Sequence, residues 1–137
     1  MTQNDIDIFA RTLYGEARGE YAKKGIAALI AVGNVIMNRF KRKTYGDTIA
    51  DVCLKPRQFS CWNQCDPNRI LIQDINLNGV PLFKCCLKVA LMLIDGEWPD
   101  LTRDSDHYHA KSIRPYWARN GKIKLHLGNH IFYKLDE

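Results

Sequence analysis

The chain opens with apolar residues at helical spacing. Asn4 is a residue type that caps helix N-termini, and we expect the helix it begins to end at Gly15. The apolar positions of this segment follow the i, i+3, i+4, i+7 pattern of an amphipathic helix and are Ile6, Phe9, Ala10 and Leu13.

A longer helix is expected over residues 21–40. The residues of its principal apolar face are Ile26, Leu29, Ile30, Gly33, Ile36, Met37 and Phe40. Alanines and a valine between these positions leave little polar surface. A helix that is apolar almost all round is a buried one, so this segment predicts the central helix of the domain.

Two shorter helices are expected over residues 48–54 and 81–95. Pro81 suits the first turn of the second of these, and Gly96 lies just past its end. Residues 56–80, between the two helices, are predicted to form a long loop. A long irregular stretch inside a compact domain is more often functional than idle.

The pattern changes to a strand-like alternation near the end of the chain. Ile123, Leu125 and Leu127 alternate with polar residues, and Gly128-Asn129 then precedes the apolar run 131–133. This is the signal of a β-hairpin with a tight turn. Helices followed by a small C-terminal hairpin or sheet place the fold in the α+β class. Because the length suits one core, we expect a single domain, residues 1–137.

The net charge of +5, with a pI near 9.0, favours an anionic partner such as nucleic acid, a membrane surface or a bacterial cell wall. The longest run of like charge is Lys41-Arg42-Lys43, which is more typical of a solvated helix end. The most apolar segment, residues 25–37, is too short to span a bilayer. We therefore expect neither nucleic-acid binding nor membrane insertion.

The first five residues, 1–5, lack the basic and apolar regions of a signal peptide. We expect a soluble monomer that is synthesised in the cytoplasm. Action outside the cell would then follow lysis, a separate export route or delivery by a particle.

The odd number of cysteines excludes a fully paired disulfide framework within one chain. Zinc is the alternative worth weighing, because Cys61 and Cys65 have a possible ligand spacing and His107 and His109 lie downstream. The second half of a four-ligand pattern is missing, however. We expect no metal and no cofactor.

The segment from Tyr14 to Glu20 carries two carboxylates and an arginine between glycines. A carboxyl group on a helix end over a cleft can be held protonated and made to donate that proton, so Glu16 is the first catalytic candidate. Glu16 and Glu20 would share a helix face, with Cβ atoms about 5–6 Å apart. Two-carboxylate glycosidases need their groups on opposite sides of the bond. Glu20 is therefore expected to begin the next helix or to pair with Arg18.

Three further clusters, at 58–63, 106–109 and 115–117, combine aromatic rings with amide, hydroxyl or imidazole groups. Rings cover the C–H faces of sugars while polar groups read their hydroxyls, although a single aromatic residue is more often part of a core. Four clusters between regular elements predict a carbohydrate cleft. The candidate substrate-binding residues are Gln58, Ser60, Trp62, His107, Tyr108, Tyr116 and Trp117.

One carboxyl group is enough for one class of glycan, peptidoglycan. Its muramic acid has a 6-hydroxyl that can act as the nucleophile, so a single carboxyl serves first as acid and then as base. The product is then a 1,6-anhydro sugar. This scheme needs Glu16 to be protonated near neutral pH, and Phe9, Leu13 and the second helix are the apolar neighbours expected to desolvate it.

Five short motifs occur in a familiar order. They are LYGEARGE at 13–20, VIMNR at 35–39, QFS at 58–60, HY at 107–108 and LGNHIFY at 127–133. Together they resemble the cell-wall hydrolase family typified by the catalytic domain of spore-cortex-lytic enzymes, over essentially the whole chain. The resemblance implies a lysozyme-like, mainly helical domain that cleaves peptidoglycan between N-acetylmuramic acid and N-acetylglucosamine, by lytic transglycosylation or otherwise by hydrolysis.

The family's catalytic glutamate matches Glu16. By the same resemblance the cleft is lined or supported by Gln58, Ser60, His107, Tyr108 and Trp117, and a structural role falls to Asn38, Arg39 and His130. The alternative is a module that binds glycan in the same cleft without turnover. Binding alone gives no reason for a carboxylate beside an anionic polymer, which favours the enzyme.

Overall fold

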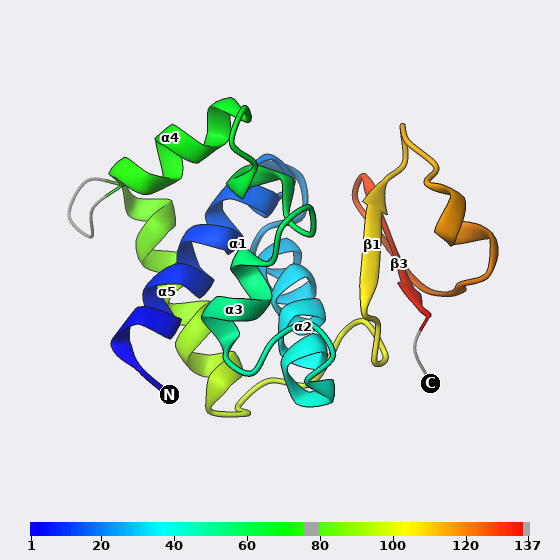
Figure 1. Ribbon diagram of the computed structural model, residues 1–137, viewed down its shortest axis with the longest axis horizontal. Coiled ribbons are helices and arrows are strands. Elements are labelled where there is room, and N and C mark those ends of the chain that lie inside the picture. Colours follow the sequence, from blue (N-terminus) through cyan, green and yellow to red (C-terminus); the bar gives the residue numbers. More distant parts are fainter. Residues whose placement is uncertain (76–79, 136–137) are drawn as a thin grey trace.

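The computed structural model describes residues 1–75 and 80–135, which form a group of helices beside a small sheet (Figure 1). In chain order the elements are α1 (Gln3–Lys24), α2 (Ile26–Arg42), α3 (Ile49–Leu54), the 3-10 helix η1 (Ser60–Trp62), α4 (Pro67–Asp74), α5 (Pro81–Ile94), β1 (His107–Ala110), the 3-10 helix η2 (Tyr116–Arg119), β2 (Lys122–Leu127) and β3 (His130–Lys134). Helices come first and strands last, which confirms the α+β prediction.

Helix α1 continues through Gly15, so the prediction that it ends there, with Asn4 as its cap, is wrong. The cap is Thr2, whose hydroxyl accepts a hydrogen bond from Asp5 N while the Asp5 carboxylate accepts one from Thr2 N. Glycine inside a helix costs about 1 kcal/mol relative to alanine, which this capping box and tertiary packing offset. The chain breaks instead at Gly25, where φ is 64° and ψ is −149°.

Helix α2 is the buried central helix that the sequence predicts, and every residue from 28 to 39 is buried. It packs against α1 and α5 on one side and against the sheet on the other. A β-carbon at Gly33 would collide with Leu93, so this glycine permits the close approach of α5. On the opposite side Ala31 and Val35 pack on Phe132 of the sheet.

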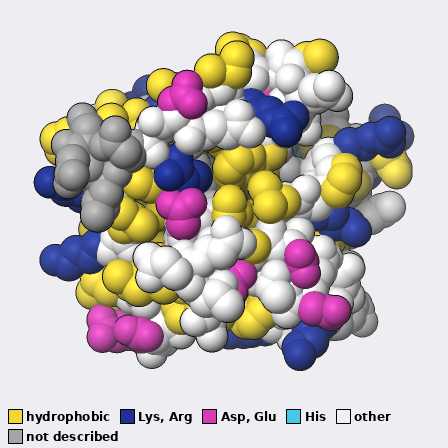
Figure 2. Space-filling view, turned by 60° about the vertical axis from the view of Figure 1, so that its left-hand side comes forward, with side chains coloured by type: hydrophobic (Ala, Val, Ile, Leu, Met, Phe, Trp, Pro, Cys, Tyr) yellow, Lys and Arg dark blue, Asp and Glu magenta, His cyan; other side chains and the backbone are white. Residues whose placement is uncertain are grey.

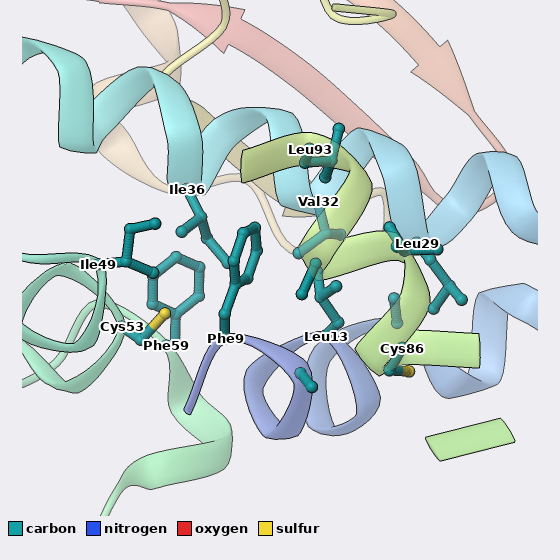
Figure 3. Close-up of a cluster of buried hydrophobic side chains, with 14 of the residues drawn as sticks. Phe9, Leu13, Leu29, Val32, Ile36, Ile49, Cys53, Phe59, Cys86 and Leu93 are labelled. Carbon is teal, nitrogen blue, oxygen red and sulfur yellow. The ribbon is translucent and has the colours of Figure 1, made fainter. Parts of the chain in front are cut away.

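The main core lies where α1, α2, α3 and α5 meet, and their apolar side chains point toward one another (Figure 3). Phe9 and Leu13 of α1 are wholly buried in this core. The other side chains labelled in the close-up are Leu29, Val32, Ile36, Ile49, Cys53, Phe59, Cys86 and Leu93.

The three strands form an antiparallel sheet in the order β1-β3-β2. β2 and β3 make the predicted hairpin, and the turn between them has Gly128 at φ 57°, a conformation that favours glycine. Strand β1 was not expected from the sequence. It pairs with β3 in the register Tyr108↔Phe132, which sets Tyr108 beside the contact between the sheet and α2.

The segment predicted as a long loop, 56–80, contains η1 and α4. Asp66 caps α4 by accepting a hydrogen bond from Asn68 N, and Pro67 occupies the first turn. Residues 76–79 of the predicted loop lie outside the described residues.

The face on which α4 and α5 lie mixes hydrophobic, basic and acidic side chains (Figure 2). Ile70 and Leu71 of α4 and Leu91 of α5 are exposed. Among the described residues, no helix combines the length and the hydropathy needed to cross a membrane.

Candidate active site

A cavity of about 350 Å³ is bounded by α1, the segment before η1 and one end of the sheet. Residues of α1, α2, η1, β1 and β3 contribute to its wall, so residues far apart in sequence meet there. The lining residues are Gly15, Glu16, Arg39, Arg57, Gln58, Phe59, Ser60, Tyr108, His109, Ala110, Ile113 and His130.

Glu16 is held in this wall by two hydrogen bonds from different parts of the fold. Its Oε2 accepts from the backbone N–H of Cys61 at 3.1 Å, and its Oε1 accepts from the hydroxyl of Tyr108 at 2.5 Å. Hydrogen bonds to an ionised carboxylate are short and strong. The two donors therefore fix the direction in which the Glu16 carboxyl faces the cavity.

Gly15 makes the first of these bonds possible. A β-carbon at Gly15 would lie 2.7 Å from Cys61 Cβ and 2.9 Å from Cys61 Sγ, closer than real β-carbons come. Because that carbon is missing, η1 packs directly on α1 and brings the Cys61 N–H to Glu16. Gly15 thus allows two helices to pack closely. The sequence had suggested instead that Gly15 turns the chain.

Tyr108 is partly buried, and its hydroxyl stays protonated as the donor to Glu16. Burial, together with the neighbouring Glu16 carboxylate, raises the pKa of Tyr108 well above its ordinary value. Its ring packs against His130 and Phe132, with centroids 4.9 and 5.4 Å away. Burial also lowers the pKa of His130, which favours a neutral imidazole beside the Tyr108 ring.

The thiol of Cys61 is not a nucleophile at neutral pH. Burial and the adjacent Glu16 carboxylate raise the pKa of Cys61 far above its ordinary value. Cys61 therefore acts through its backbone N–H. The described residues hold no group of three His, Cys, Asp or Glu side chains suited to a metal ion, so the zinc alternative gains no support.

A second cavity, of about 310 Å³, adjoins the first, and both include Arg39, Arg57, Gln58 and Tyr108 in their walls. The wall of the second cavity is completed by His107 and Trp117. Nδ1 of His107 lies 2.9 Å from Asp106 Oδ1, and the Trp117 ring lies 4.9 Å from the His107 ring, centroid to centroid.

The structure brings most of the predicted site residues to these two cavities. Those that line one or both are Glu16, Gln58, Ser60, His107, Tyr108 and Trp117. Trp62 is not among them, because its indole N–H donates to Thr12 Oγ1 at 2.8 Å and its ring packs on the main core. Tyr116 is 83% exposed and lines neither cavity. Contrary to the prediction, Trp62 and Tyr116 therefore do not line the cleft.

Glu20 and Arg18 do not pair with each other as expected. Glu20 lies inside α1, and its Oε1 accepts from Asn129 N at 3.1 Å in the hairpin turn. The Arg18 guanidinium donates to Asn68 Oδ1 and lies over the Tyr14 ring. Glu20 ties α1 to the hairpin and lines neither cavity.

Phe9 and Leu13 do not desolvate Glu16 as expected, because these two side chains point into the main core (Figure 3). The neighbours that contact the Glu16 carboxyl are Cys61 and Tyr108. Glu16 itself is only partly buried.

Three residues with a predicted structural role tie α2 and the hairpin to the rest, and two of them also reach the cleft. Asn38 donates to Asp100 Oδ2 and Ser105 O, both at 2.9 Å. Arg39 and His130 line the first cavity as well. No sequence motif pointed to Arg57, a loop residue whose positive φ is seen only in the structure.

Comparison with known families places these features in context. The family model described as Cell Wall Hydrolase matches residues 23–133 of this chain, a range that begins just after Glu16. The chain is 37% identical over 133 residues to a spore cortex-lytic enzyme of Bacillus cereus, covering 97% of the chain and 45% of that enzyme. It is 41% identical over 59 residues to that of Oceanobacillus iheyensis, covering 43% of the chain and 20% of that enzyme. The chain spans less than half the length of these relatives.

Two solved structures share the fold. One is the catalytic domain of the germination-specific lytic transglycosylase SleB from Bacillus anthracis, with a TM-score of 0.74 and 27% identity over 98% of this chain and 97% of that one. The other is the catalytic domain of the Bacillus cereus SleB protein, with a TM-score of 0.73 and 28% identity over 97% and 91% of the two chains. These similarities confirm the predicted lysozyme-like, mainly helical fold.

Proposed function

Because this chain belongs to the cell wall hydrolase family, we propose that it cleaves peptidoglycan glycan strands by lytic transglycosylation, with Glu16 as acid and base. The bond cleaved is that between N-acetylmuramic acid and N-acetylglucosamine. The observation that carries this proposal is the Glu16 carboxyl, oriented in a cavity wall by the Cys61 N–H and the Tyr108 hydroxyl. The similar SleB domain from Bacillus anthracis, described as a lytic transglycosylase, supports the reaction type.

The reaction needs one carboxyl group, and the site offers one. Among the described residues that line the two cavities, Glu16 is the only carboxylate. Protonated Glu16 gives its proton to the glycosidic oxygen as the bond from that oxygen to C1 of muramic acid breaks. The 6-hydroxyl of the same sugar then bonds to C1 and gives its proton back to Glu16. The products are a 1,6-anhydromuramic end and a free 4-hydroxyl on the leaving sugar.

Cys61 and Tyr108 stabilise Glu16 between the two proton transfers. Glu16 is a carboxylate at that moment, and both neighbours donate to it. They lower the free energy of the ionised form and keep its oxygens aimed at the bond.

Removing the Tyr108 hydroxyl tests this role. Tyr108→Phe keeps the ring that packs on His130 and Phe132 but deletes the donor to Glu16. Looser positioning of the acid is expected to lower kcat by about tenfold to a hundredfold.

The matched control is Tyr133→Phe, which removes a hydroxyl bonded to His109 Nε2 at 2.8 Å on the same sheet. Its kcat should equal that of the wild-type protein. An unchanged kcat in folded Tyr108→Phe would show that the hydroxyl does not act on Glu16.

Incubation with purified sacculi separates turnover from binding. The proposal predicts soluble muropeptides that accumulate with time and with protein concentration. Sedimentation of the protein with the wall, without soluble product, would instead support a non-catalytic glycan-binding module.

A further inference from the structure

The wall of the second cavity is rich in cationic side chains. Arg39 and Arg57 both line it, and none of its described lining residues is a carboxylate. Asp106, the acid next to His107, is buried outside this wall and accepts hydrogen bonds from Arg42 Nη1 at 2.7 Å and Leu135 N at 2.9 Å. The cavity therefore favours an anionic group.

Arg39 is a fixed part of this wall. It is 4% exposed, its Nε donates to Asp106 O at 2.7 Å, and its guanidinium lies over the rings of Tyr45 and Phe59. Its Nη1 donates to Gln58 Oε1 at 3.3 Å, which links it to the side-chain amide of the same wall. A guanidinium held in this way adds charge to the site without needing to be ordered by the ligand.

Arg57 is placed differently. It is exposed, belongs to both cavities and, within the described residues, takes part in no ion pair. Its backbone has φ 67°, a left-handed conformation that is strained for a residue with a β-carbon. Such conformations gather at ligand sites, where the rest of the fold maintains them.

The other residues of the second cavity suit a ligand whose negative charge is carried on a short aliphatic chain. The Trp117 ring is packed edge-on against Tyr133, with centroids 5.4 Å apart, and against His107. An aromatic wall beside two guanidinium groups fits a carboxylate on a short carbon chain better than it fits a neutral sugar ring.

We propose that the second cavity binds a carboxylate on the 3-O-lactyl substituent of muramic acid. This inference rests on the proposed function. The lactyl carboxyl is either free or joined to a peptide stem that has carboxylates of its own. N-acetylglucosamine carries no such group, so a carboxylate site beside Glu16 tells the two alternating sugars apart. The cavity thereby sets the register in which Glu16 meets the bond after muramic acid.

Three glycan substrates separate the sources of the charge. The first has intact stems, the second has been stripped by an amidase to leave the free lactyl carboxylate, and the third is the stripped strand with that carboxyl converted to a methyl amide. Arg57→Ala should raise KM about tenfold on the strands with carboxylates, the order expected for a charge-assisted hydrogen bond, and leave KM unchanged on the amide strand. Arg57→Lys should recover part of the loss on the charged strands.

The matched control is Arg103→Ala. Arg103 is also exposed with a left-handed backbone, at φ 53°, but lines neither cavity, so KM should stay at the wild-type value on every strand. A larger effect of Arg57→Ala on stripped strands assigns the lactyl carboxylate, and a larger effect on stem-bearing strands assigns the stem. Equal effects of Arg57→Ala on the charged and amide strands would overturn the inference.

Failure of this inference can be told from failure of the proposed function. If the wild-type protein releases no product from any strand, the proposed function fails. In that case the Kd of each strand is measured for the wild-type protein and for Arg57→Ala. Equal affinity of the two proteins for the strands with carboxylates overturns the inference as well.

Discussion

Glu16→Gln is expected to fold like the wild-type protein and to cleave peptidoglycan more slowly by a factor of about 10²–10⁴. The amide oxygen can still accept from the Cys61 N–H, and the amide N–H₂ can donate to the Tyr108 oxygen, so both contacts persist. An amide cannot give a proton to the glycosidic oxygen or take one from the 6-hydroxyl. Release of soluble muropeptides from sacculi measures the loss, and thermal unfolding by circular dichroism verifies the fold.

Glu20→Gln is the matched control for the one-carboxylate site. It makes the same chemical change one helical turn later, at a side chain that contacts Asn129 N in the hairpin turn. Its rate of cleavage should remain that of the wild type even if its stability falls. A folded Glu20→Gln protein as inactive as Glu16→Gln would mean that two carboxylates take part.

Gly15→Ala is expected to impair stability and activity together. The new β-carbon would press on Cys61 and, at 3.2 Å, on Ile72 Cγ2, and both of these residues are fully buried. Overpacking of this kind costs about 1–3 kcal/mol of unfolding free energy. If η1 moves away to relieve the contact, the Cys61 N–H leaves Glu16 and cleavage slows.

Gly19 provides the comparison within the same helix. A β-carbon there has no neighbour within 4 Å, so Gly19→Ala should gain about 0.5–1 kcal/mol from helix propensity and keep full activity. Urea unfolding of the two variants gives the free energies, and the sacculus assay gives the rates. Equal stability and activity of the two variants would contradict the role assigned to Gly15.

The elements with a strong periodic pattern were predictable from the sequence. The burial of α2 follows from its apolar residues on every side, and the β2–β3 hairpin follows from alternation around Gly128. Weaker patterns failed for physical reasons. Gly15 suggested a helix end because its packing partner, Cys61, is distant in sequence and cannot be inferred from local propensity. Strand β1 was not predicted because it is short and its His-Tyr-His side chains show no apolar alternation.

The candidate site was predictable in its residue types and less so in its contacts. Glu16 and Tyr108 stand out as titratable or aromatic groups in polar clusters. A backbone donor such as the Cys61 N–H leaves no mark in a sequence, because every non-proline residue has one. Trp62 lies in an aromatic and polar cluster of the sequence as Trp117 does, yet its hydrogen bond to Thr12 holds it against the core.

In the proposed mechanism one carboxyl, Glu16, cleaves the strand while the substrate supplies the nucleophile. Digestion of purified sacculi in water enriched in heavy oxygen, followed by mass spectrometry of the released muropeptides, shows whether the nucleophile is the 6-hydroxyl of the sugar or water. The wild-type protein should produce 1,6-anhydromuramic ends that contain no heavy oxygen, and Glu16→Gln should produce almost none. Reducing muramic ends that carry heavy oxygen would show that water is the nucleophile and would contradict the claim.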